Sequence, residues 1–194
     1  ALSCSLIVPA SADISFRDVP ASHWAYSAIR EMQNAGLVNG MGGGRFEPNG
    51  TVSRAQFLTM AVRLTEQELG CTVTPESGGG YWAAPYYEAA VNLGLLEGGG
   101  DAIALPDASG QRAWLEAPIT RYEMAVIENN VLAGAGNYEY DASSVTSAVM
   151  PDYDSLPAQY RDAVCRMYSL GILTGQTGGY FNGDKTVQDT AKQI

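Results

Sequence analysis

Residues 24–40 read Trp-Ala-Tyr-Ser-Ala-Ile-Arg-Glu-Met-Gln-Asn-Ala-Gly-Leu-Val-Asn-Gly, and this stretch decides the fold because its pattern occurs twice more. The second copy runs from Trp82 to Gly98 and the third from Gln159 to Gly175. In each copy the apolar side chains stand at offsets 0, 3, 4, 7 and 10, which form one face of an α-helix. They are Ala25, Ala28, Ile29, Met32 and Ala35; Ala83, Tyr86, Tyr87, Ala90 and Leu93; and Tyr160, Ala163, Val164, Met167 and Leu170. Such self-similarity predicts three copies of one helical unit.

Each of these helices is expected to stop at a glycine. The three ends read Ala-Gly-Leu-Val-Asn-Gly at 35–40, Leu-Gly-Leu-Leu-Glu-Gly at 93–98 and Leu-Gly-Ile-Leu-Thr-Gly at 170–175. A glycine after the last helical turn adopts positive φ without strain, and the two aliphatic residues that follow can then fold back onto the helix.

A turn-rich loop follows the first helix. Residues 44–52 read Gly-Arg-Phe-Glu-Pro-Asn-Gly-Thr-Val and match residues 179–187 without a gap, whereas copy two carries a longer segment, 101–118, in this place. Each loop of copies one and three holds an aromatic residue that is expected to be buried.

A second helix is predicted after the loop. Ser53-Arg54-Ala55-Gln56 and Thr120-Arg121-Tyr122-Glu123 both fit the capping box, in which the first and fourth residues satisfy each other's backbone N–H groups. The third copy reads Val187-Gln188-Asp189-Thr190-Ala191 here, with neither a capping box nor a cation. The predicted unit is thus a helical hairpin: helix, glycine-rich loop and capped helix.

Composition excludes several functions. The chain has 194 residues, 11 basic and 21 acidic, and a formal charge of −10, which disfavours nucleic acid and anionic membrane surfaces. No stretch reaches the ~18 apolar residues of a membrane span. His23 is the only histidine, so neither a Ser-His-Asp site nor a histidine metal cluster can be built. The glycines at 40–44 lack the lysine of a phosphate loop. We expect no catalytic residue, no metal and no cofactor.

The first twelve residues permit two interpretations. Leu6-Ile7-Val8 followed by Ala10-Ser11-Ala12 resembles the back half of a secretory signal with its cleavage site, but it also suits an apolar arm packed on a neighbouring surface.

The three cysteines also permit two interpretations. Removal of Cys4 with a leader would leave Cys71 and Cys165 as a pair able to form a disulfide, and the alternative is that they are free thiols.

Several motifs resemble the S-layer homology family. Phe16-Arg17-Asp18-Val19-Pro20-Ala21-Ser22-His23-Trp24-Ala25 is similar to the opening of such a repeat, and Gly44-Arg45-Phe46-Glu47-Pro48 to its middle. Residues 52–56 and 119–123 resemble the family's Thr-Arg-Ala-Glu signature. The resemblance covers about residues 13–194; the first copy is the specific match and the others are degenerate.

The resemblance implies an all-α fold. Three helix-loop-helix repeats would lie in a pseudo-threefold arrangement around a central helical bundle. The expected domains are a leader or arm at 1–12, repeat one at 13–70, repeat two with an insertion at 71–149, and a truncated or degenerate repeat three at 150–194.

The resemblance also implies a function. Family members bind secondary cell-wall polysaccharide, often pyruvylated, in grooves between repeats, so we expect a non-catalytic, extracellular module that anchors to the bacterial cell surface or wall. The ligand-binding residues carried over are Arg54, Arg121, Asp18, Trp24 and Trp82. Arg54 and Arg121 also suit anion binding physically, because each stands at the first position of a helix. The competing interpretation is a solvated arginine paired with a nearby carboxylate.

A second function is consistent with the same sequence. The apolar arm and the incomplete third repeat also suit a self-assembling extracellular protein, an S-layer or filament subunit. In such a homo-oligomer or polymer, a neighbouring subunit would complete the arm or the third repeat.

Overall fold

The computed structural model describes residues 5–6, 16–76, 80–98, 103–136 and 139–186. Its helices are α1 (Tyr26–Asn34), α2 (Arg54–Leu69), α3 (Ala84–Asn92), α4 (Gln111–Glu116), α5 (Arg121–Ala135) and α6 (Ala158–Ser169). Short 3₁₀ turns occupy Ala142–Ser144, Tyr153–Ser155 and Thr177–Gly179. Strands β1 (Ser5–Leu6) and β2 (Cys71–Thr72) form one antiparallel pair. The described chain is therefore helix-rich, in agreement with the predicted all-α class.

The three helix ends predicted from the repeat are confirmed. Gly36, Gly94 and Gly171 all adopt left-handed backbone, with φ of 73°, 70° and 72°. The residue after each glycine donates a hydrogen bond to the carbonyl five residues back, at 2.8 Å for Leu37, 2.9 Å for Leu95 and 2.9 Å for Ile172. This is the Schellman motif, which satisfies carbonyls that the helix leaves without partners.

Both capping boxes are confirmed as well. Ser53 accepts a hydrogen bond from the Gln56 amide, and Thr120 accepts one from the Glu123 amide. In return, the side chains of Gln56 and Glu123 accept from the backbone N–H of the cap residues, each at 2.9 Å. The starts of α2 and α5 are thereby held in the same conformation.

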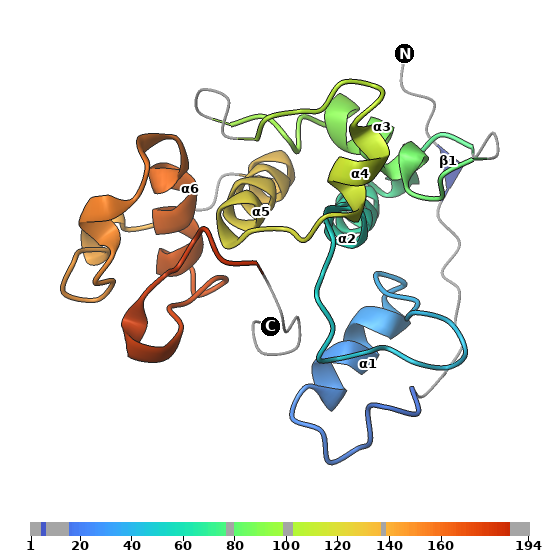
Figure 1. Ribbon diagram of the computed structural model, residues 1–194, viewed down its shortest axis with the longest axis horizontal. Coiled ribbons are helices and arrows are strands. Elements are labelled where there is room, and N and C mark those ends of the chain that lie inside the picture. Colours follow the sequence, from blue (N-terminus) through green and yellow to red (C-terminus); the bar gives the residue numbers. More distant parts are fainter. Residues whose placement is uncertain (1–4, 7–15, 77–79, 99–102, 137–138, 187–194) are drawn as a thin grey trace.

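The helices pair between copies rather than within them. α2 packs mainly against α3 and α5, and α5 packs against α2 and α6 (Figure 1). The prediction of simple helical hairpins is therefore wrong for the described residues. The physical reason is the loop between α1 and α2, which carries the chain away from α1 so that α2 buries its apolar residues against the following copy.

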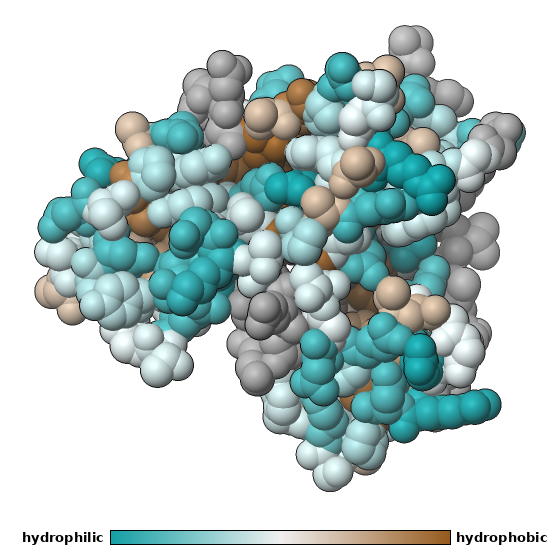
Figure 2. Space-filling model, viewed as in Figure 1, coloured by the Kyte–Doolittle hydropathy of each residue, from teal (hydrophilic) through white to brown (hydrophobic). Residues whose placement is uncertain are grey.

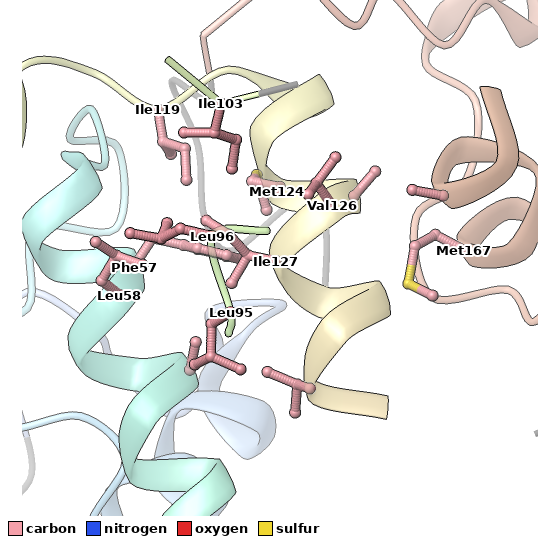
Figure 3. Close-up of a cluster of buried hydrophobic side chains, with 14 of the residues drawn as sticks. Phe57, Leu58, Leu95, Leu96, Ile103, Ile119, Met124, Val126, Ile127 and Met167 are labelled. Atoms are coloured by element: carbon pink, nitrogen blue, oxygen red, sulfur yellow. The ribbon is translucent and has the colours of Figure 1, made fainter. Parts of the chain in front are cut away.

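Two hydrophobic clusters result. The main cluster joins α2, α3, α5 and α6, and Figure 3 shows Phe57 and Leu58 of α2 opposite Ile127 of α5. Val126 lies on the side of α5 that faces Met167 of α6 (Figure 3). A smaller cluster of Phe16, Val19, Ala25 and Ile29 supports α1 alone.

Polar contacts connect the α1 lobe to the rest of the molecule. Arg63 of α2 donates to the Leu37 carbonyl at 3.1 Å, and Gln67 donates to the Ala35 carbonyl. Hydrophilic side chains cover most of the face seen in Figure 2. None of the helices in the described ranges has the length and apolarity needed to cross a membrane.

Further predictions concern the arm, the cysteines and the ends of the chain. Ser5 and Leu6 pair with Thr72 and Cys71 of the same chain, while the remainder of residues 1–12 lies outside the described residues. Cys165 is a buried free thiol and Cys71 is disulfide-bonded, so these two cysteines do not pair. The second helix expected in copy three, around Asp189, also lies outside the described residues.

Candidate functional site

Arg121 stands at the start of α5 and reaches into copy three. Its Nε donates to the Phe181 carbonyl at 2.8 Å and its Nη2 to the Thr174 carbonyl at 2.6 Å. The guanidinium carbon lies 4.6 Å from the centre of the Phe181 ring, within the range of a cation–π contact. Only 1% of the residue is exposed. Burial lowers the pKa of Arg121, although the negative charges of Glu128 and Asp152 act in the opposite direction.

Arg54 makes the corresponding contacts with copy two. Its Nη1 donates to the Trp114 carbonyl at 3.3 Å, and its guanidinium carbon lies 5.0 Å from the centre of the Trp114 ring. Its Nε also forms an ion pair with Glu123 at 2.8 Å. Because 16% of the Arg54 side chain and 12% of the Glu123 side chain are exposed, this pair is largely shielded from water. Trp114 of α4 thus takes the place in copy two that Phe181 has in copy three.

The two arginines therefore connect successive copies. Arg54, in copy one, stacks on an aromatic residue of copy two, and Arg121, in copy two, stacks on an aromatic residue of copy three. Backbone contacts follow the same order, because the Arg54 amide donates to Ala117 at 3.0 Å and the Arg121 amide to Lys185 at 3.1 Å. Both side chains are thus engaged within the chain, whereas the sequence left open contact with an anionic ligand or a solvated pairing with a carboxylate.

Asp18 holds the loop of copy one. Its two carboxylate oxygens accept hydrogen bonds from the backbone amides of Phe46 at 2.9 Å and Glu47 at 2.7 Å. Burial acts to raise the pKa of Asp18, but these hydrogen bonds and the charge of Arg45 outweigh it, so the pKa lies below its ordinary value. The carboxylate shapes the loop, which needs this support because Glu47 adopts a positive φ of 63°.

The two candidate tryptophans differ in their surroundings. Trp24 and Trp82 occupy equivalent places before α1 and α3, and they are 56% and 52% exposed. Trp24 stacks on His23, with 5.8 Å between ring centres, whereas Trp82 lines an open pocket of about 440 Å³. Among the five residues proposed from sequence, Trp82 is the one that lines this pocket.

The pocket lies where the end of α1 and its loop meet α2. Its lining includes Asn39, Gly40, Met41, Phe46, Arg63 and Trp82. Apolar side chains and a few polar groups in one concave surface are typical of a ligand site. Within the described ranges, His, Cys, Asp and Glu side chains form no group of three that could hold a metal ion.

Arg63 was not identified from the sequence. It lies in the third turn of α2, outside any motif, and its Nη2 donates to the Tyr86 hydroxyl at 3.2 Å. With the Asn39 amide oriented to satisfy its hydrogen bonds, the Asn39 oxygen accepts from the same nitrogen at 3.2 Å. The one available signal was that Arg63 is the only cation of the helix beyond Arg54. Arg63 lines the pocket only because the end of α1 packs against α2, and this tertiary contact is not visible in the sequence.

Comparison with known proteins finds a family match in copies one and three. The model of the family described as the S-layer homology domain matches residues 15–58 and 150–187. An endoglucanase of Bacillus sp. (strain KSM-635) is 28% identical over 92% of the chain, and an S-layer protein of Bacillus thuringiensis subsp. finitimus is 27% identical over 92%. A cellulosome-anchoring protein of Acetivibrio thermocellus is 33% identical over 57%. The chain covers 18%, 20% and 26% of these relatives, respectively, so it spans about a quarter of their length or less.

The fold and these matches define a helical repeat module of the cell surface. Two segments of the chain, residues 15–58 and 150–187, match the S-layer homology domain. The family places the protein outside the cell, at the cell surface or in the cell wall.

Proposed function

We propose that the protein is a non-catalytic module that binds cell-wall polysaccharide and thereby anchors to the cell envelope. The observation that carries this proposal is the open pocket beside Trp82, in a chain whose family and relatives are associated with surface layers and anchoring. An exposed indole provides a flat apolar face against which a sugar ring can stack.

A three-repeat arrangement is part of the proposal. Residues 13–70, 71–149 and 150–194 would form three units with pseudo-threefold symmetry around the second helices. The three equivalent helix ends and the arginine contacts from each copy to the next support it. Copy two, which the family model does not match, contains α4 in place of the short loop.

Binding of pyruvylated polysaccharide is the finer part of the proposal. Arg63 lies in the pocket with Trp82, and a guanidinium can bind the carboxylate of a pyruvyl group with two hydrogen bonds. Arg54, Arg121 and Asp18 then act indirectly, by fixing the loops and the relative placement of the copies. Trp24 lies outside the pocket lining and is not part of the proposed binding site.

Co-sedimentation with purified bacterial sacculi tests this proposal. The protein is expected to sediment with intact sacculi and to remain in solution with sacculi stripped of their secondary polysaccharide. Trp82→Ala should weaken binding by about fivefold or more, because about 1–3 kcal/mol of stacking energy is lost. Trp24→Ala is the matched control, since it removes an equally exposed tryptophan outside the pocket lining. Equal binding by wild type and Trp82→Ala would exclude the pocket as the site.

Binding to depyruvylated polysaccharide tests the proposed recognition of the pyruvyl group by Arg63. Arg63→Gln should lower the affinity for pyruvylated polysaccharide and have little effect on the depyruvylated form. An equal loss for both forms would assign Arg63 to the structure of the pocket wall and remove it from ligand recognition.

A further inference from the structure

The two backbone carbonyls and the aromatic ring that surround the Arg121 guanidinium form a cradle, and the pocket contains the corresponding groups of copy one. In copy three, the Thr174 and Phe181 carbonyls accept the two guanidinium hydrogen bonds, and the Phe181 ring lies against the cation. Thr174 and Phe181 each lie 135 positions after their counterparts in copy one, Asn39 and Phe46. Both counterparts line the pocket.

The loop around the cradle has the same conformation in both copies. Asp18 accepts hydrogen bonds from the amides of Phe46 and Glu47, and Asp152 accepts from the two corresponding amides of copy three at 2.8 and 2.9 Å. The residue after the aromatic has positive φ in each case, 63° at Glu47 and 53° at Asn182. The backbone that presents the two carbonyls and the ring is therefore built alike.

The cradles differ in what fills them. Phe181 is fully buried beneath Arg121 and Tyr122, whereas Phe46 is only half-buried. In the described part of the chain no guanidinium stacks on Phe46. The sequence position in copy three that corresponds to Arg54 is Asp189, so copy three has no arginine to place there.

Charge at the cradle favours a cation. Asp152 lies close enough to Arg121 to stabilise its positive charge, and Asp18 occupies the same position beside the loop of copy one. Glu47 adds a second carboxylate, and Arg45, which pairs with Glu47 at 2.6 Å and also acts on Asp18, offsets part of this negative charge. The net charge of −10 further attracts cationic groups from solution.

Arg63 restricts where a cation can lie. It occupies the wall formed by α2 and α3, where it donates to the Leu37 carbonyl and the Tyr86 hydroxyl. A second positive charge beside it would be repelled. The favourable place for a cation is thus against the Phe46 ring, and Trp82 of the pocket lining provides a stacking surface.

We propose that this pocket recognises a glycan that carries a free, protonated amino group. The ammonium lies against the Phe46 ring and donates to the carbonyls of Asn39 and Phe46, and the sugar ring stacks on Trp82. An ammonium over an aromatic face and beside carbonyl acceptors is bound by cation–π attraction and charge-assisted hydrogen bonds. N-acetylation removes the charge and adds bulk, so the acetylated form of the same glycan is rejected. This inference rests on the proposed function and specifies the ligand of the same pocket.

Two matched oligosaccharides test the proposal by titration calorimetry at pH 6, where glucosamine is protonated. The probes are the tetramer of glucosamine and the tetramer of N-acetylglucosamine. We expect the glucosamine tetramer to bind at least about tenfold more tightly, which corresponds to about 1.4 kcal/mol. Equal affinities, tighter binding of the acetylated tetramer, or no binding of either tetramer would overturn the proposal.

Variants separate this inference from simple stacking. Phe46→Leu and Glu47→Gln should each reduce the preference for the glucosamine tetramer, and Glu47→Gln keeps the Phe16–Phe46 contact that supports the loop. Trp82→Ala should weaken both probes, and Trp24→Ala should weaken neither. Circular dichroism establishes that each variant is folded. A preference unchanged in both Phe46→Leu and Glu47→Gln would contradict the proposed position of the amine.

The two proposals can fail separately. A protein that sediments with sacculi but does not distinguish the two tetramers would retain the anchoring function and lose the amino-sugar specificity. A protein that prefers the glucosamine tetramer but does not sediment with sacculi would retain this pocket chemistry and lose the anchoring function.

Discussion

Arg121 is a charged residue in the interior of the protein, and the contacts on all sides of it explain why it is tolerated there. Two carbonyls of copy three accept its hydrogen bonds, an aromatic ring lies against its face, and Asp152 and Glu128 offset its charge. A buried cation is costly unless it is hydrogen-bonded and paired. Arg121 therefore acts as a positioning residue that holds the loop of copy three against the start of α5.

We predict that Arg121→Ala lowers the free energy of unfolding by about 3 kcal/mol or more, because buried carbonyls lose their donor and a cavity remains. Urea denaturation followed by circular dichroism measures the change. Arg112→Ala is the control, since Arg112 forms an exposed pair with Glu116 and its removal should leave the midpoint almost unchanged. Similar urea midpoints for the two variants would contradict the role of Arg121 as a positioning residue.

Glu128 predicts a dependence of stability on pH. Burial raises the pKa of Glu128 from 4.5 to about 8, although the charge of Arg121 acts to lower it. Its Oε2 atom is buried without a hydrogen-bond partner among the described residues. Because the folded state holds this proton more tightly than the unfolded state, the free energy of unfolding should fall as the pH rises from 4.5 to about 8.

We expect Glu128→Gln to remove most of this dependence, since glutamine has the same shape and no charge. Between pH 6 and pH 9, the wild-type protein should lose about 2 kcal/mol more than the variant. Urea midpoints at both pH values measure the difference. Parallel behaviour of the two proteins would show that Glu128 ionises normally in the fold.

At the scale of elements, the glycines that end α1 and close its loop have different roles. Gly36 has a φ of 73° and open space where a Cβ would stand. Gly40 has the same φ, but its Cβ would lie 2.4 Å from the Phe16 ring and 2.6 Å from the Arg45 carbonyl oxygen. Gly36→Ala thus introduces backbone strain alone, and Gly40→Ala adds steric overlap.

Gly36→Ala should cost about 1 kcal/mol, the usual penalty of an alanine in left-handed backbone. Gly40→Ala should cost clearly more, about 3 kcal/mol, because the loop that holds Phe46 must move. It should also weaken glycan binding, since Gly40 lines the pocket. Thermal denaturation ranks the two variants, and a larger loss for Gly36→Ala would contradict the loop geometry.

The elements themselves were predictable from the sequence. Helix periodicity, the glycine ends and the capping boxes are local features, so the start of α2 at Arg54 and of α5 at Arg121 follow from a few neighbouring residues. The pairing of α2 with α3 was not predictable in the same way. This pairing depends on the path of a glycine-rich loop. The pattern of apolar residues on α2 predicts a buried face but not which helix packs against that face.

The candidate site was predictable only in part. Trp82 was identified because the resemblance to S-layer homology repeats carried the tryptophan of the opening motif over to the second copy, and it lines the pocket. Arg63 was missed because nothing local distinguishes it from a solvated arginine. Trp114 was missed as the partner of Arg54 because the loop of copy two is longer, and sequence alignment does not bring it opposite Phe46 and Phe181.

For the whole molecule, Arg54 connects copy one to copy two and Arg121 connects copy two to copy three, while no guanidinium of the described residues stacks on Phe46 in the α1 lobe. A surface-anchoring protein is expected to place its glycan site where two copies meet, and the pocket is lined by residues of copy one together with Trp82 of copy two. The most direct test is a map of amide chemical shifts on titration with purified cell-wall polysaccharide. We predict that the changes centre on residues 37–41, the Phe46 loop and the indole N–H of Trp82. Changes confined to the α6 lobe, or none at saturating polysaccharide, would contradict this account.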